Sequence, residues 1–178
     1  MSSIDSVNLL TRRSAGTWAQ QQKLTAADAA GNLYVADTFN STIRFIDRAG
    51  VVRTVAGLPG SAGSVDARGS AARFNYPMGV ATDLTGRVYV VDTGNQTIRR
   101  IDSDGVVSTL AGASGQRGNA DGLGAAARFS YPTGITVDAT GDLFVADTAN
   151  QTVRKVTRDG LVTTLAGLSG AIGNADGN

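Results

Sequence analysis

The sequence predicts an all-β fold built from three copies of one structural unit. One stretch, GRVYVVDTGNQTIRRI at residues 86–101, has a similar copy on either side of it in the chain. Asp37, Asp92 and Asp147 mark the same place in the three copies, so the repeat length is 92 − 37 = 147 − 92 = 55 residues. Thr, Val and Ile dominate the apolar segments and Gly, Asp and Asn separate them, which is typical of strands joined by turns. No segment shows a sustained helical period.

The 55-residue period divides the chain into an N-terminal lead-in and three units. The lead-in, residues 1–13, is expected to be a tail or a docking arm, and the units span residues 14–68, 69–123 and 124–178. The second and third units open with a Gly- and Ala-rich segment that ends in an aromatic residue and a proline, GSAARFNYP and GAAARFSYP. The first unit is degenerate here and lacks the Tyr-Pro pair.

Each unit is expected to contain four short strands. The first strand is expected at residues 24–28, 79–83 and 134–138. The second strand reads LYVA, VYVV or LFVA, and such continuous apolar runs are typical of strands buried on both faces. A turn reading DTFNS, DTGNQ or DTANQ leads to the third strand, and a turn with a glycine leads to the fourth.

Four antiparallel strands repeated along a chain are typical of a β-propeller blade. A single blade cannot bury both of its faces and must stack on a neighbour at each side. We therefore predict a β-propeller with three four-stranded blades per chain. A β-solenoid is the alternative, although solenoid repeats are usually shorter and lack four distinct turns.

Composition excludes several classes of function. The chain of 178 residues has 16 basic and 15 acidic residues and a net charge of +1, which argues against nucleic acid or an anionic membrane as a partner. It has no Cys and no His, so thiol chemistry and the usual proton-transfer side chain are absent. No apolar run approaches the length of a membrane span, and the first residues do not read as a secretory signal. We expect no cofactor and no metal.

The chain resembles the NHL-repeat family at YPTGITVDATGDLFVADTANQTVRKV, residues 131–156, and at residues 76–101. The resemblance extends over residues 20–167, and the long Gly-rich linker at 113–129 is similar to that of bacterial NHL proteins. It implies a six-bladed propeller that serves as a binding platform, and it favours an extracellular setting. A few relatives are lyases or lactonase-like hydrolases. Many NHL repeats have His where this chain has the residues Ser41, Gln96 and Gln151.

Three blades are too few for a closed ring, since known propellers have about four to eight. Two chains would supply six blades, so we expect a homodimer that closes one ring. The repeat register agrees, because Asn178 aligns with Leu123 and the next position would correspond to Ser14. The alternative is a larger propeller that has been cut or designed at a repeat boundary.

The binding site is predicted on the face that carries the long links between blades. Because a propeller chain enters each blade at its innermost strand, the linkers 57–77 and 112–132 share a face with the turns between second and third strands. Long links carry function more often than short ones. The candidate ligand-binding residues on this face are Arg73, Tyr76, Asn95, Arg128, Tyr131 and Asn150. The alternative is that Phe74 and Phe129 anchor the linker while the arginines and tyrosines brace it.

Two further sets of repeated residues are candidates for structural roles. Asp37, Asp92 and Asp147 are expected to accept hydrogen bonds from backbone N–H groups of the following turn. The arginines across the same hairpins are expected to pair with them or with a neighbouring blade, and these are Arg44, Arg99 and Arg154. Repetition in every unit favours a brace over a catalytic group. Asp28, Asp83 and Asp138 end the first strands, and in a ring they would surround the channel and could hold a cation or water. Turn formation in D-x-x-G is the alternative.

The predicted function is non-catalytic. We expect a scaffold or binding module for a protein or a carbohydrate, because the repeated Asp residues give no asymmetric catalytic set. One alternative is a propeller hydrolase or lyase that uses the channel carboxylates. Another is a designed or truncated propeller fragment without a ligand.

Overall fold

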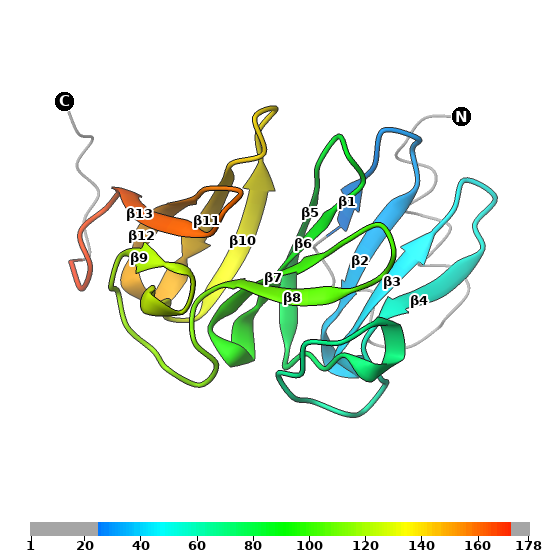
Figure 1. Cartoon of the computed structure of the whole chain (residues 1–178), viewed down its shortest axis with the longest axis horizontal. Coiled ribbons are helices and arrows are strands. Elements are labelled where there is room, and N and C mark those ends of the chain that lie inside the picture. The colour runs from blue at the N-terminus through cyan, green and yellow to red at the C-terminus, as the bar shows by residue number, and fades with distance from the viewer. Residues whose placement is uncertain (1–24, 172–178) are drawn as a thin grey trace.

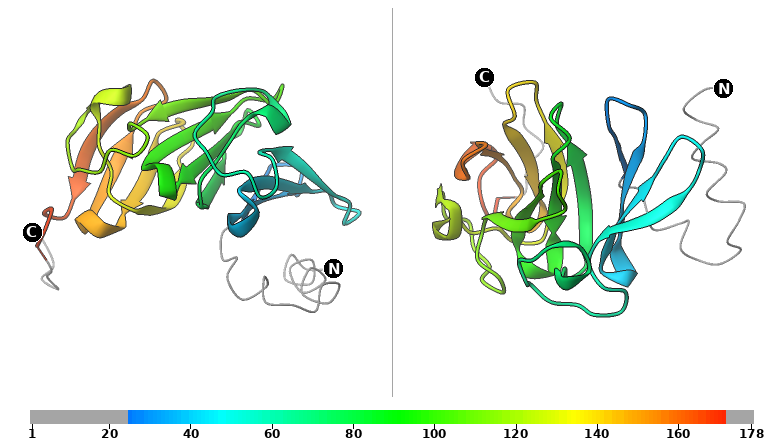
Figure 2. Two further views of the ribbon diagram at one scale, coloured as in Figure 1. Left: turned by 90° about the horizontal axis from the view of Figure 1, so that it is seen from below. Right: turned by 45° about the vertical axis from the view of Figure 1, so that its right-hand side comes forward.

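The computed structural model describes residues 25–171 as three antiparallel sheets that follow one another along the chain (Figure 1). The N-terminal lead-in, the start of the first unit and the last residues of the third lie outside the described residues. Within 25–171 there is no helix long and apolar enough to cross a membrane. Figure 2 shows the sheets standing in a row, each with one face turned toward the next.

Each sheet contains the four strands expected from the repeat, in sequence order. The second and third strands of all three sheets coincide closely with the expected segments, while the first strands of the second and third sheets begin at the proline. The strands are β1 (Thr25–Ala27), β2 (Leu33–Asp37), β3 (Thr42–Ile46) and β4 (Val52–Ala56); β5 (Pro77–Thr82), β6 (Val88–Asp92), β7 (Thr97–Ile101) and β8 (Val107–Ala111); β10 (Pro132–Val137), β11 (Leu143–Asp147), β12 (Thr152–Val156) and β13 (Leu161–Ala166).

The core lies between the sheets. Because side chains alternate across a strand, the apolar second strands β2, β6 and β11 supply residues to both faces of their sheets. Ala36 and Ile43 of the first sheet pack against Val80 and Val90 of the second, and the second sheet packs in the same way on the third. Apolar burial between successive blades is the main stabilising term, at about 25 cal/mol per Å² removed from water.

The linkers supply an element that the repeat pattern did not predict. β9 (Gly122–Leu123) lies in the linker before β10 and pairs antiparallel with β13, the outermost strand of the third sheet, which becomes five-stranded. The preceding linker makes the equivalent contact, because Val107 N donates to Ala67 O and Arg68 bridges Val106. Each linker therefore covers the outer edge of the next blade, which removes an exposed strand edge.

Candidate functional site

The linkers and the turns between second and third strands lie on one face, as predicted, and we call it the linker face. It runs along the lower side of Figure 1, opposite the hairpin tips that follow β1, β5 and β10. The turns contain the short 3-10 helices η2 (Thr38–Asn40), η4 (Thr93–Asn95) and η6 (Thr148–Asn150). Gly60 N donates to Asn40 O and Gly115 N donates to Asn95 O, so each linker begins by resting on the turn of its own blade.

Asn95 and Asn150 are buried and tie the linkers down. Asn95 Nδ2 donates to Gly63 O at 2.7 Å and to Asp92 Oδ2 at 2.8 Å. Asn150 Nδ2 makes the same two bonds, to Gly118 O at 2.7 Å and to Asp147 Oδ2 at 2.8 Å. Since both amide donors are used within the fold, these two candidate binding residues hold the linker and do not face a ligand.

A buried arginine links the hairpin of the second blade to its linker. Arg99 is fully buried, and its Nη1 lies 2.8 Å from Asp92 Oδ2 while its Nη2 lies 2.5 Å from Asp66 Oδ1. The same guanidinium donates to the main-chain oxygens of Arg73 and Val65 and lies over the Phe74 ring at 5.2 Å. The predicted pairing of Asp92 with Arg99 is therefore present, and a second carboxylate joins it.

The third blade repeats this arrangement. Arg154 pairs with Asp147 at 2.9 Å and with Asp121 at 2.6 Å, and it lies over Phe129. Asp121 also accepts from Thr164 N and Thr164 Oγ1 on β13. Asp66 and Asp121 therefore fasten the linkers to the blades that follow, a role that the sequence pattern did not reveal.

The aspartates at the ends of β6 and β11 differ in one respect from their predicted role. Asp92 Oδ1 accepts from Asn75 N, 17 residues earlier in the chain, and not from a main-chain N–H of the following turn. Asp147 accepts from Ser130 N in the same way. The carboxylate thus fixes the end of the linker just before the innermost strand. Burial raises the pKa of Asp92 to about 6, and the bonds from Asn75, Asn95 and Arg99 oppose that rise.

The first blade has the equivalent Asp, Asn and Arg residues, but their contacts differ from those in the other two blades. Asn40 donates to both carboxylate oxygens of Asp37 at 2.9 and 3.0 Å. Arg44 is only half-buried and donates to Thr54 Oγ1 at 2.9 Å. Thr11 stands where the later units have Asp66 and Asp121, so the sequence itself lacks the second carboxylate.

Tyr76 and Tyr131 are the two candidate binding residues that remain accessible, at 42% and 43% exposed. Each lies directly before the proline that begins an innermost strand and has a left-handed backbone, with φ of 54° and 46°. That conformation is uncommon for a bulky residue and costs on the order of 1–3 kcal/mol. At Tyr131 a contact between blades holds it, since Gln96 Oε1 accepts from Tyr131 N at 2.7 Å.

Different side chains accompany the two tyrosines. Phe39, which is 53% exposed, meets the ring of Tyr76 edge-on with centroids 5.4 Å apart. The guanidinium of Arg117 lies 4.0 Å from the centre of the Tyr131 ring and also donates to its hydroxyl. Phe39 and Arg117 were not among the predicted site residues, because each occurs in only one unit and a repeat-based search gives such residues no weight.

Arg73 and Arg128 are braces. Arg73 Nη1 donates to Ser70 O and Ala72 O, both at 2.7 Å. Arg128 Nη1 donates to Ala125 O and Ala127 O. These bonds tighten the 3-10 turns η3 (Gly69–Ala71) and η5 (Gly124–Ala126), so the bracing alternative describes these two residues.

The carboxylates of Asp28, Asp83 and Asp138 follow the innermost strands on the opposite face and close turns. Asp83 Oδ1 accepts from Thr85 N, Thr85 Oγ1 and Arg87 N. Burial alone would raise the pKa of Asp83, but these bonds outweigh it and hold the pKa below its usual value. Among the described residues no three His, Cys, Asp or Glu side chains gather as a metal site.

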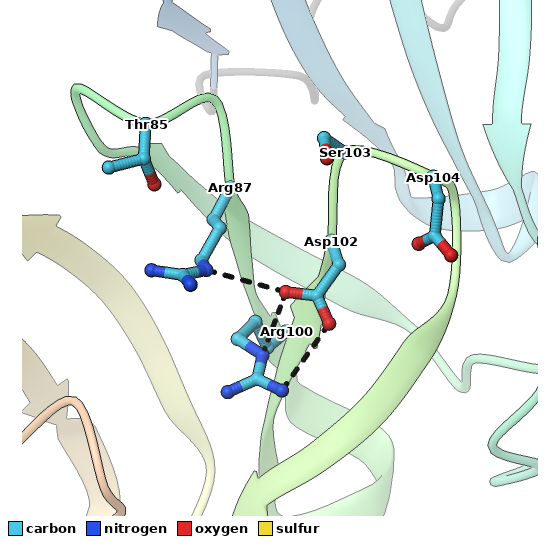
Figure 3. A pocket seen from close by; sticks show the side chains of 6 residues that line it. All are labelled: Thr85, Arg87, Arg100, Asp102, Ser103 and Asp104. Carbon is cyan, nitrogen blue, oxygen red and sulfur yellow. Dashed lines mark hydrogen bonds and ion pairs between the residues drawn. The ribbon is translucent and has the colours of Figure 1, made fainter.

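An open hollow of about 450 Å³ lies on that opposite face of the second blade (Figure 3). Arg87 and Arg100 both point toward Asp102, with Nε to Oδ1 distances of 3.4 and 3.2 Å. Asp104 on its rim pairs with Arg68 at 2.6 Å. Because the charges pair with one another, the hollow presents no unpaired charge to a ligand.

Comparison with known proteins identifies the family of the repeats. A model described as "NHL repeat" matches residues 129–156, and one described as "Teneurin NHL domain" matches residues 59–121. The chain belongs to the NHL-repeat family. It is 32% identical to Protein SUPPRESSOR OF QUENCHING 1, chloroplastic, of Arabidopsis thaliana over 79% of this chain and 14% of that protein. It is 32% identical to NHL repeat-containing protein 2 of Gallus gallus over 68% of this chain and 18% of that protein. The NHL chain thus spans less than a fifth of these relatives.

Solved structures agree on the fold. A Bacteroides thetaiotaomicron protein of unknown function matches with a TM-score of 0.67 and 29% identity over 75% of this chain and 33% of that one. A catalytically inactive virginiamycin B lyase from Staphylococcus aureus, solved with quinupristin, matches with a TM-score of 0.58 and 16% identity over 85% and 42% of the two chains. These structural neighbours are β-propellers, so the three NHL sheets correspond to propeller blades.

Proposed function

We propose that this NHL chain is a non-catalytic binding module that takes a protein or carbohydrate ligand on its linker face. The observation that carries the proposal is the pair Tyr76 and Tyr131, which the fold holds half-exposed in a strained left-handed conformation beside the innermost strands. Aromatic rings with accessible faces bind the apolar face of a sugar or a side chain of a peptide, and such rings are enriched at binding surfaces.

The surroundings of the tyrosines support binding more than catalysis. Phe39 and Arg117 extend the aromatic surface and add one cation, which is already engaged with Tyr131. The nearby carboxylates Asp92 and Asp147 are fully buried and paired with arginines. Asp66 and Asp121 on the linkers are about half exposed and accept from threonine hydroxyls, but each is also paired with a buried arginine. Because the same arrangement recurs in two blades, it favours a structural role over an acid–base mechanism.

A glycan array and a peptide library, followed by calorimetry on the hits, would test the binding role. Replacing Tyr76 or Tyr131 with Ala should weaken binding of a hit about five- to thirtyfold, since one stacked ring contributes about 1–2 kcal/mol. Leu84→Ala is the matched control, because Leu84 is 79% exposed on the opposite face. Loss of binding in Leu84→Ala but not in the tyrosine variants would exclude the linker face. No hit at all would favour a purely structural propeller fragment.

We further propose that a second copy of the chain completes the ring. Three blades per chain make six in a dimer, which lies within the range of known propellers. Light scattering after size exclusion over a dilution series tests this directly. A mass of twice the chain supports the closed ring, and a monomer at all concentrations rules out a homodimer.

A further inference from the structure

A hollow of about 260 Å³ lies between the first and second blades, on the side opposite the linker face. Tyr34, Arg53 and Val55 line it on the first blade. Val88 and Ile101 of the second blade line it too, and since both are buried they form its floor. The turn at residues 102–105 also contributes to the lining, and Figure 1 shows this turn, between β7 and β8, reaching toward the first sheet.

The first-blade wall is an aromatic and cationic cluster built across three strands. Tyr34 on β2, Phe45 on β3 and Arg53 on β4 are direct cross-strand neighbours. The rings of Tyr34 and Phe45 meet edge-on with centroids 5.2 Å apart, and the guanidinium of Arg53 lies 4.1 Å from the centre of the Phe45 ring. The ring holds the guanidinium by a cation–π contact, which leaves the N–H groups at its edge to donate elsewhere.

The polar ends of this cluster are not used within the fold. Among residues 25–171, neither the Arg53 guanidinium nor the Tyr34 hydroxyl forms a hydrogen bond, and no carboxylate pairs with Arg53. Burial raises the pKa of Tyr34, and the charge of Asp28 raises it further, so the hydroxyl is protonated near neutral pH and can donate. Two donors without an acceptor in this part of the chain therefore line the hollow.

The junction between the second and third blades satisfies the equivalent groups internally. Tyr89, the equivalent of Tyr34, is 2% exposed, and its hydroxyl donates to Asp83 Oδ2 at 3.1 Å. Arg100 stands where the first unit has Phe45, and its Nε lies 3.2 Å from Asp102 Oδ1. The open donors are thus a property of the first junction and not of the repeat.

Two differences between the units explain the open donors. Asn32 stands where the second unit has Arg87, and its Nδ2 donates to Asp28 Oδ2 at 2.9 Å. That oxygen is the equivalent of the one that accepts from the tyrosine hydroxyl in the second blade. Arg53 stands where the second unit has Ser108, so the first blade gains a cation at this place without gaining an acid.

The other charges at the hollow already have partners. Arg68 donates to Asp104 Oδ2 at 2.6 Å and to Asp104 O at 2.7 Å. Asp102 pairs with two arginines of its own blade. Of the charged residues that line the hollow, Arg53 is therefore the one without an opposite charge among residues 25–171, and it favours an anion.

We propose that this hollow binds a small aromatic carboxylate, whose carboxylate group accepts from Arg53 and the Tyr34 hydroxyl and whose ring lies against Tyr34 and Val55. The planar guanidinium offers parallel N–H groups that match the two oxygens of a carboxylate. The volume of about 260 Å³ is just below the range of about 300–1,000 Å³ for drug-sized ligands, so the ligand is small. The site is separate from the linker face and depends neither on the binding role proposed there nor on the proposed ring.

Titration of the full chain with benzoate tests the proposal, with benzamide as the neutral probe of the same shape. Benzoate should bind with a Kd of about 1 mM, the range expected of so small a ligand, and about tenfold or more tightly than benzamide. Amide chemical shifts from NMR give the location. The amides of Tyr34, Val55 and Gly105 should move with benzoate.

Arg53→Gln removes the cation and should weaken benzoate binding about tenfold or more, to the level of benzamide. Arg48→Gln is the matched control, because Arg48 is also an exposed arginine of the first blade but does not line the hollow. It should leave benzoate binding unchanged. The midpoint of thermal unfolding should be alike in the two variants, so a loss of binding in Arg53→Gln cannot come from unfolding.

Equal affinities for benzoate and benzamide, or unchanged benzoate binding in Arg53→Gln, would overturn the inference. So would the absence of shifts at the hollow in about 10 mM benzoate, ten times the expected Kd. Benzoate binding that is lost in Arg117→Gln and kept in Arg53→Gln would assign the anion to the linker face, which also overturns it.

Discussion

Replacing Arg99 with Met should show how much the buried arginine contributes to the fold. The substitution keeps an apolar side chain of similar length and removes the guanidinium that lies 2.8 Å from Asp92 and 2.5 Å from Asp66. Asp92 is fully buried and would lose its only cationic partner among the described residues. The linker would lose the bonds to Arg73 O and Val65 O at the same time.

The expected loss is about 3–5 kcal/mol, the usual cost of removing one partner of a buried ion pair. The contact with Asp66 adds little to this, because the Asp66 side chain is 46% exposed and solvent screens the pair. For a chain of this size each kcal/mol corresponds to a shift of about 2–4 °C, so the midpoint should fall by roughly 6–20 °C.

Urea and thermal unfolding followed by circular dichroism would measure the loss, with Arg44→Met as the matched control. Arg44 is the equivalent residue of the first blade, but it is half-buried and, within residues 25–171, its side chain donates only to Thr54. Its replacement should cost about 1 kcal/mol or less. Hydrogen exchange gives a second readout, because the amides of Gly63 and Arg73, which bond within the linker, should exchange faster only in Arg99→Met. Equal losses in the two variants would refute a special role for the buried pair.

Further variants test individual parts of the same scaffold. Burial raises the pKa of Asp92 to about 6, so as the pH falls Asp92 takes up a proton in the folded chain before it does so in the unfolded chain. The unfolding free energy of the native chain relative to Asp92→Asn, measured with urea, should therefore increase as the pH falls from 7 to 5. A relative decrease would mean that the pairing with Arg99 outweighs burial in setting this pKa. Gly112→Ala should destabilise strongly, since its φ is +89° and the new Cβ would lie 2.4 Å from Gln96 O, whereas Gly115→Ala, with a similar φ but open space around it, should cost about 1 kcal/mol. Phe129→Ala should cost about 3–5 kcal/mol of unfolding free energy because the ring is fully buried between blades, while Phe39→Ala should change stability little because that ring is 53% exposed.

The strands were predictable from the sequence because each is a local apolar segment that recurs at a fixed interval. β9 was not, because Gly122–Leu123 has no strand-like composition and forms only by pairing with β13, which lies far along the chain. The role of Asp66 was missed for a related reason. A Gly-rich segment around an acidic residue predicts a turn, whereas its bond to Arg99 joins residues 33 positions apart.

In the candidate site, residue type and position predicted ligand contacts that the fold does not leave available. Arg73 and Asn95 were singled out because arginine and asparagine on long linkers often contact ligands, but their donors are used on neighbouring main-chain oxygens and on Asp92. Residue type and spacing do not reveal whether a donor is already satisfied within the fold. The candidates Tyr76 and Tyr131 differ in that their side chains remain accessible.

Residues that recur in every unit serve the scaffold, whereas residues that differ between units can make a ligand site specific. The carboxylate–arginine pairs at Asp92 and Asp147 recur with nearly identical distances, as a scaffold requires. If the linker face binds a ligand as proposed, its selectivity must come from positions where the units differ. Phe39 stands where the next unit has Gly94, at which a Cβ would lie 2.6 Å from Asn75. Arg117 stands where the second unit's linker has a small residue, Ala62. One tyrosine therefore has an aromatic neighbour and the other a cation, so a ligand spanning both would be bound in one orientation only.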